Sequence, residues 1–127
     1  MSKFSIAQQP EFVLEVSISR IGGEAAPVPF TFHFLEREKF ASYLDRKEAH
    51  RQEMLALIRA EASSVTEVTK RATAYQLKEL KGIIKDWGFA EPYNAKNLAA
   101  LVGSMASVPE AIFEAFERGY TPARLGN

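Results

Sequence analysis

The sequence predicts an α+β fold, in which an N-terminal β-hairpin is followed by a predominantly helical body of about four helices. Apolar residues alternate with a period of two before residue 35 and recur at helical spacing after residue 36. The chain has 127 residues, within the roughly 100–200 that usually form one domain. We therefore expect a single domain over residues 1–127, with a β-hairpin at 10–35, a helical body at 36–120 and a flexible tail at 121–127.

The predicted hairpin consists of two strands with one apolar face each. The first strand is indicated by four apolar residues at alternating positions: Phe12, Leu14, Val16 and Ile18. Gly22-Gly23 interrupts it, and Phe30, Phe32 and Phe34 give the second strand an aromatic face. An isolated hairpin is only marginally stable in water. We therefore expect these three phenylalanines to face a dry interface, covered either by a helix of the same chain or by another subunit.

A long helix is predicted from about residue 37 to residue 61, roughly 37 Å at 1.5 Å per residue. Its apolar residues lie near its two ends, and its middle is almost wholly polar. We therefore expect buried ends and an exposed middle. A break near residues 46–50 is the alternative, although no Gly or Pro marks one. The apolar residues at the two ends are Phe40, Tyr43, Leu44, Met54, Leu55 and Ile58.

A second helix is predicted to begin at Ser64, which forms a capping box with Glu67. It is expected to continue to Trp87 and to end at Gly88. Its first half is rich in threonine, which is a weak helix former. One broad apolar face of this helix carries Val65, Val68, Ala72, Tyr75, Leu80, Ile83 and Trp87.

Two shorter helices are predicted near the C-terminus. Asn94 is a good N-cap for the first of them, and the stretch Ser107–Glu110, with Pro109 in the first turn, is a start signal for the second. Gly119 is expected to end the last helix. The apolar residues of the two helices are Leu98, Leu101, Val102 and Met105, followed by Ile112, Phe113, Ala115 and Phe116.

The composition excludes several classes of function. The chain contains no cysteine, which excludes disulfide scaffolds and thiolate chemistry. His33 and His50 lack the spacing of a metal site, and no phosphate-binding loop or nucleophile motif is present. We therefore expect no enzyme activity, catalytic residues, metal or cofactor. No signal peptide or stretch of about 18 apolar residues is found, so the expected location is the cytoplasm, without membrane binding.

Charge is unevenly distributed although the chain has 16 basic and 16 acidic residues. Residues 70–85 carry five cations and one anion, and residues 86–117 carry five anions and one cation. Either these are solvated polar surfaces, or they meet within one subunit or between subunits and help the chain to form a homo-oligomer. Lys78, Lys81 and Lys85 are expected to share one helix face. Without a basic excess, nucleic-acid binding is not expected.

Candidate partner-binding residues come from aromatic clusters and from the basic helix face. Trp87, Phe89 and Tyr93 gather around Gly88 and Pro92, where Trp87 either fills the core between helices or anchors a partner. On the last helix, Phe113 extends the apolar surface toward a flank that a partner could cover. The full candidate set is Trp87, Phe89, Tyr93, Phe113, Phe116, Tyr120, Lys78, Lys81 and Lys85.

Several of these segments together resemble the tail assembly chaperones of long-tailed bacteriophages. The resemblance spans about residues 12–127 and rests mainly on a Trp-Gly element followed by two short helices. The Thr-rich segment 60–80 departs from the family pattern. The matching motifs are Ile83-Ile84-Lys85-Asp86-Trp87-Gly88-Phe89, Pro92-Tyr93-Asn94, Asn97-Leu98, Leu101-Val102, Val108-Pro109-Glu110-Ala111-Ile112-Phe113-Glu114-Ala115-Phe116 and the ending Ala123-Arg124-Leu125-Gly126-Asn127.

The resemblance implies a non-enzymatic chaperone that acts in the cytoplasm of the infected host cell. Such a protein binds the tape measure protein, which is a long, apolar, helical chain, and keeps it soluble. It also helps recruit tail tube subunits, so the major tail tube protein is a second expected partner. The family also implies self-association. The alternative is a structural virion component, such as a head–tail connector or tail-completion protein. A small DNA-binding regulator is a third hypothesis.

Overall fold

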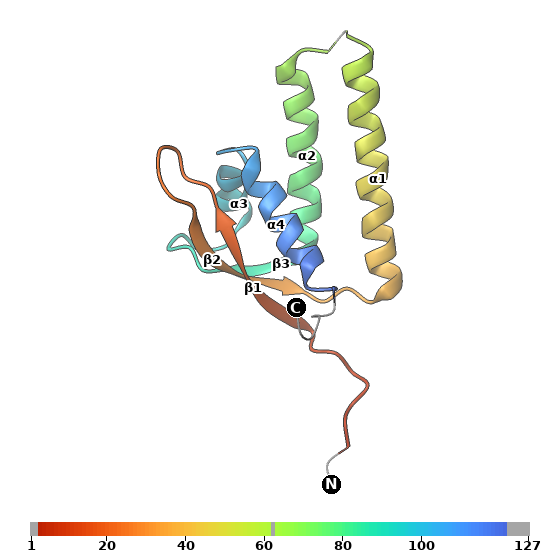
Figure 1. Cartoon of the computed structure of the whole chain (residues 1–127), viewed down its shortest axis with the longest axis vertical. Coiled ribbons are helices and arrows are strands. Elements are labelled where there is room, and N and C mark those ends of the chain that lie inside the picture. Colours follow the sequence, from red (N-terminus) through yellow and green to blue (C-terminus); the bar gives the residue numbers. More distant parts are fainter. Residues whose placement is uncertain (1–2, 62, 122–127) are drawn as a thin grey trace, which may run out of the picture.

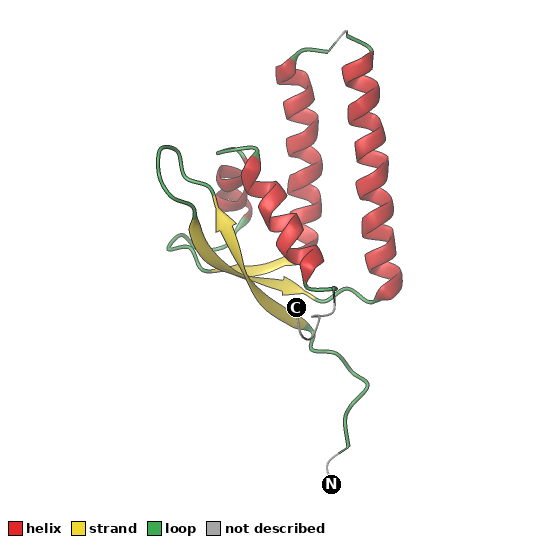
Figure 2. Ribbon diagram, viewed as in Figure 1, coloured by secondary structure: helices red, strands yellow, loops and turns green. Residues whose placement is uncertain are grey.

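The computed structural model describes residues 3–61 and 63–121, and it has the expected α+β architecture (Figure 1). A β-hairpin comes first, and four helices and one further short strand follow. Figure 2 shows the helices gathered on one side of the small sheet, with a two-helix hairpin projecting away from it. In chain order the elements are β1 (Glu11–Ile18), β2 (Ala26–His33), α1 (Arg37–Arg59), α2 (Val65–Ile83), β3 (Ile84–Trp87), α3 (Ala95–Val102) and α4 (Ser107–Arg118).

The N-terminal hairpin is confirmed, and its two strands pair antiparallel with Phe12 opposite Phe32. Phe30 and Phe32 are fully buried, which confirms a dry aromatic face covered by helices of the same chain. Phe34 differs from this expectation because β2 ends at His33. Its ring is half-buried and stacks on Tyr120 with a centroid distance of 5.9 Å, so it packs beside the sheet edge instead of on the sheet face.

A third strand, β3, was not predicted and replaces the last turn of the expected second helix. The helix ends at Ile83, and Ile84 already has an extended backbone with φ −89° and ψ 129°. Strand β3 completes an antiparallel sheet of order β1-β2-β3, in which Trp87 lies opposite Phe30. Pairing with β2 supplies backbone hydrogen bonds that outweigh the helical spacing of Ile83 and Trp87. Trp87 is therefore a strand residue, and Gly88 does not end a helix.

Helix α1 is a single unbroken helix, as predicted, but only its first half is anchored in the core. Tyr43 is fully buried and packs against Phe116 of α4, with ring centroids 5.3 Å apart. At the other end, Ile58 is exposed. The expectation of two buried ends therefore holds only for the first end, since Met54 and Leu55 toward the other end are half-buried. The α1–α2 hairpin extends beyond α4 there (Figure 1).

The predicted helix boundaries at Ser64, Asn94 and Gly119 are confirmed. Ser64 Oγ accepts from the N–H of Glu67 at 3.1 Å, and Asn94 Oδ1 accepts from the N–H of Asn97 at 2.8 Å. Gly119 is the C-cap of α4. The start of α4 is at Ser107, as the start signal indicated, with Pro109 in its first turn. Of the predicted tail 121–127, the residues after Thr121 lie outside the described part of the chain.

Candidate partner-binding surfaces

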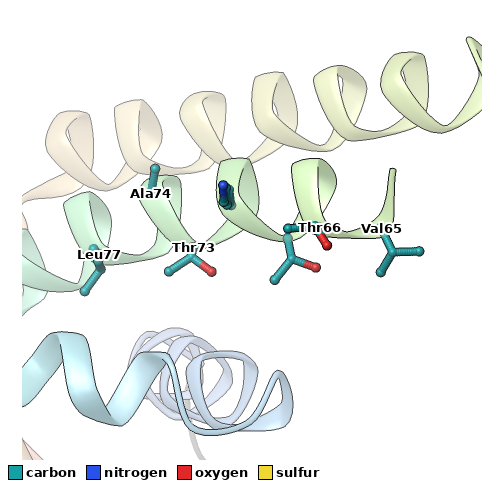
Figure 3. Close-up of a pocket in the computed structure, with 7 residues that line it drawn as sticks. Val65, Thr66, Thr73, Ala74 and Leu77 are labelled. Atoms are coloured by element: carbon teal, nitrogen blue, oxygen red, sulfur yellow. The ribbon is translucent and has the colours of Figure 1, made fainter. Parts of the chain in front are cut away.

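One face of α2 is largely apolar, and it is exposed at Val65 and Thr69 and half-buried at Thr73 and Leu77, which the sequence did not indicate. It lines an open groove of about 500 Å³. Figure 3 shows Thr73 and Leu77 pointing away from α1, toward the side where the helices drawn in blue lie. Val65, expected on the buried face, is 84% exposed. We call this surface the α2 face; it consists of Val65, Thr66, Thr69, Lys70, Thr73, Ala74 and Leu77.

The α2 face arises from the spacing of side chains along the helix. Val65, Thr69, Thr73 and Leu77 recur every four residues and therefore form one stripe along α2. Tyr75, on another side of the helix, stacks flat on His50 of α1 at a centroid distance of 3.9 Å. The stripe was missed because threonine was considered only as a weak helix former. A β-branched side chain also presents a methyl group, and three β-branched residues followed by a leucine at four-residue spacing are the signal that identifies the stripe.

The contact between α1 and α2 is polar along much of its length. Arg46 of α1 makes a bidentate ion pair with Glu79 of α2, at 2.7 and 3.0 Å. Glu79 is buried, whereas Arg46 is half exposed. Further toward the tip, Arg71 pairs with Glu53 at 3.4 Å. The Arg46–Glu79 pair is the stronger polar link between the two helices, because Glu79 is buried, whereas the exposed Arg71–Glu53 pair contributes little.

The stability of this contact is expected to depend on pH through His50. Burial lowers the pKa of His50, and the nearby Glu53 opposes that shift. The unfolded chain therefore takes up a proton near pH 6.5 before the folded chain does. Stability should fall as the pH drops below about 6.5. Thermal unfolding of the parent and of His50→Phe, which keeps a stacking ring, measures this effect. An equal loss of Tm in both proteins on acidification would contradict it.

Trp87, Phe89 and Tyr93 do lie together, as the sequence predicted, but in the segment from β3 to α3. The Trp87 ring centroid is 5.1 Å from that of Phe89 and 5.0 Å from that of Tyr93. Trp87 itself is a core residue, and its Nε1 donates to the carbonyl oxygen of Glu91 at 2.8 Å. Trp87 and Phe89 line one side of a hollow of about 290 Å³ against Asn97 and Leu101 of α3. The interpretation of Trp87 as a core residue is therefore favoured over that of an exposed anchor.

The three candidates at the end of the chain are packed inside the fold. Phe116 is fully buried, so it offers no surface to a partner in this structure. Phe113 is half-buried, with its ring centroid 6.3 Å from those of Tyr43 and Tyr75. Tyr120 is also half-buried, and its hydroxyl accepts from the N–H of Leu35 at 2.8 Å. Phe113 thus joins α4 to the α1–α2 hairpin, and an aspartate at this position is expected to weaken the fold itself.

The three candidate lysines do not share one helix face. Lys78 and Lys81 are exposed on α2, but Lys85 lies on β3 and pairs with Glu11 of β1 at 2.5 Å. The acidic segment 86–117 likewise pairs with a cation outside the basic segment, because Glu117 of α4 accepts from Lys47 of α1 at 2.8 Å. No ion pair joins the segments 70–85 and 86–117 within the described residues. Contact between them across subunits stays a prediction.

The described residues contain no group of three or more His, Asp or Glu side chains placed to hold a metal ion. Over the same residues, no single helix is long and apolar enough to cross a membrane, although α3 and α4, bent by 111°, pass that test as a pair. The fold and its surfaces thus define a small α+β protein whose prominent features are uncovered apolar faces. Such faces are typical of proteins that bind other proteins.

The family model for phage tail assembly chaperones matches residues 1–127, the whole chain. The protein therefore belongs to the phage tail assembly chaperone family. Its role is tail assembly, its partners are phage tail proteins, and a chaperone family indicates binding instead of catalysis. No curated protein and no solved structure shows a significant match to the chain.

Proposed function

We propose that this chaperone binds the tape measure protein, keeps it soluble until the tail tube encloses it, and helps recruit tube subunits in the cytoplasm of the host cell. The observation that supports this proposal is the uncovered α2 face on a helical hairpin that projects from the body (Figure 1). Membership of the family supports the tail assembly role itself.

The α2 face suits an amphipathic helix, because a groove lined by apolar side chains accepts the apolar stripe of such a helix. Val65, Thr69 and Thr73 of this face have short side chains, so the backbone of a second helix can approach closely there. The stripe from Val65 to Leu77 spans about 18 Å at 1.5 Å per residue, which corresponds to roughly three turns of a bound helix. Lys70 at the edge of the groove favours an acidic residue on the flank of that helix.

We expect the double variant Val65→Asp/Thr69→Glu to lose most of its ability to keep a co-expressed tape measure protein soluble. Both positions are exposed, so the new charges do not enter the core. They would have to be desolvated under a bound helix, which disfavours binding. The soluble fraction of the tape measure protein is the measurement, and circular dichroism of the purified variant checks its fold.

The matched control is Ile58→Asp, which places a carboxylate on an exposed apolar residue of α1 in the same projecting hairpin. This variant should rescue the tape measure protein as well as the parent does. A second comparison is Phe89→Ser, in the hollow beside α3. If Phe89→Ser loses the rescue while Val65→Asp/Thr69→Glu keeps it, the binding site lies at the hollow and not on the α2 face. If the unaltered chain gives no rescue, the proposed partner is wrong.

A further inference from the structure

An N-terminal arm carries two large apolar side chains that no described part of the chain covers. The arm comprises residues 3–10 before β1, and Phe4 and Ile6 are fully exposed. Its root is fixed, because the N–H of Phe34 donates to the carbonyl oxygen of Pro10 at 2.9 Å. From there the arm leaves the body of the molecule (Figure 1). Exposing an alternating Phe-x-Ile segment to water is unfavourable unless something covers it.

A groove lies beside the root of this arm, between the first turns of α1 and the last turn of α2. Its outer part, about 550 Å³, is lined by Ala7, Gln8, Phe34 and Gly82 among others. Its inner part, about 370 Å³, continues past Ser42 and Ile83 to the Arg46–Glu79 ion pair. Leu35, Lys39 and Gly82 line both parts, so the two form one continuous groove. We call it the Gly82 groove.

Gly82 is a glycine that the chain itself does not require. A Cβ at Gly88 would lie 2.6 Å from Pro29 Cγ, and one at Gly119 would lie 2.5 Å from Phe12 Cε2, so packing explains those two glycines. A Cβ at Gly82 would meet nothing within 4 Å. Glycine inside a helix is destabilising by about 1 kcal/mol relative to alanine. A glycine at this helical position is explained if another segment packs in the open space above Gly82.

We propose that the Gly82 groove receives the N-terminal arm of a second copy of this chain, so that two copies exchange arms and place Phe4 and Ile6 in each other's grooves. Both features lie at one end of the molecule, since Ala7 and Gln8 already line the mouth of the groove. A two-fold axis near this mouth brings each arm onto the other copy's groove, which gives a closed and self-complementary dimer.

The arm's own conformation favours exchange over folding back. Ser5 Oγ accepts from the N–H of Ala7 at 3.1 Å, which turns the chain locally just beyond the groove mouth. In this conformation Phe4 and Ile6 both stay fully exposed. A buried aromatic side chain alone removes about 150–250 Å² from water. Covering Phe4 and Ile6 in both copies therefore gives a favourable apolar contribution to dimer formation.

Disulfide trapping between two singly substituted full-length chains tests the exchange directly, because the chain has no cysteine of its own. Ile6→Cys is mixed with Gly82→Cys under mild oxidation, and the disulfide-linked heterodimer is followed on a non-reducing gel. Gly23→Cys, in the exposed β1–β2 turn, replaces Gly82→Cys as the control. We expect the heterodimer with Gly82→Cys to form at least ten times faster. Equal rates, or an exclusively intrachain disulfide in the Ile6→Cys/Gly82→Cys chain, would overturn the proposal.

Sedimentation equilibrium provides an independent test without cross-linking. Phe4→Ser/Ile6→Ser should raise the dimer dissociation constant at least ten-fold, and Gly82→Gln, which fills the groove with a longer side chain, should do the same. Ile21→Ser is the matched control, because Ile21 is 85% exposed in the β1–β2 turn, away from arm and groove; it should leave the constant unchanged. A parent chain that stays monomeric, or variants that dimerise like the parent, would overturn the proposal. Neither result bears on the α2 face or on tape measure binding.

Discussion

Phe32→Ala should lower the free energy of unfolding by about 3–5 kcal/mol, the range measured when a fully buried phenylalanine is truncated. Phe32 is completely buried, and its ring centroid lies 5.5 Å from that of Phe12 and 5.4 Å from that of Phe116. The substitution removes apolar contacts and leaves a cavity where the hairpin meets α4. Urea unfolding followed by circular dichroism measures the change.

Ile21→Ala is the control for this prediction, because it removes a large apolar side chain from a position that is 85% exposed. Its effect on the free energy of unfolding should lie within about 0.5 kcal/mol. If Phe32→Ala were as mild as Ile21→Ala, the sheet face would not be packed against α4, and the arrangement of the hairpin under the helices would be wrong.

Much of the fold could be predicted because local signals and the final structure agree. Alternation at Phe12 and Phe32 reflects a sheet with one buried face. Side-chain caps at Ser64 and Asn94 act through contacts only three residues away. Such features depend on neighbours along the chain, so they do not require knowledge of the tertiary structure.

The features that the sequence did not predict depend on contacts between distant segments. Ile84 to Trp87 continue a helical spacing, but they become a strand because β2 offers them a hydrogen-bonding edge. Phe113 was expected to extend the outer apolar surface, yet it packs against Tyr75, about forty residues earlier in the chain. Helical periodicity predicts which residues share a face, but not which of two apolar faces is covered.

The same reasoning explains why the partner-binding candidates changed. Large aromatic residues such as Trp87 and Phe116 were candidates because they dominate binding energy at interfaces. The same residues also fill cores, and here the fold uses both in that way. The surfaces left uncovered are instead made by small and β-branched residues on α2 and by Gly82, whose importance becomes apparent only when their surroundings are known.

The attachment of the projecting hairpin gives a second large expected effect. Arg46→Met should destabilise the chain by about 2–3 kcal/mol, because it leaves the carboxylate of Glu79 buried without its partner. The value is below the roughly 3–5 kcal/mol of a fully buried pair, since Arg46 is 48% exposed and water can reach the vacated position.

The companion double variant Arg46→Met/Glu79→Leu should return close to the parental stability, because it removes both charges and fills the space with apolar side chains. Comparison of the two variants separates the penalty of an unpaired charge from the loss of packing. The control is Lys47→Met, at the position after Arg46 on α1. It removes a half-exposed ion pair with Glu117 of α4 and should change stability by less than about 1 kcal/mol. If Arg46→Met were no more harmful than Lys47→Met, Glu79 would be hydrated, and the polar contact would not be what holds α1 against α2.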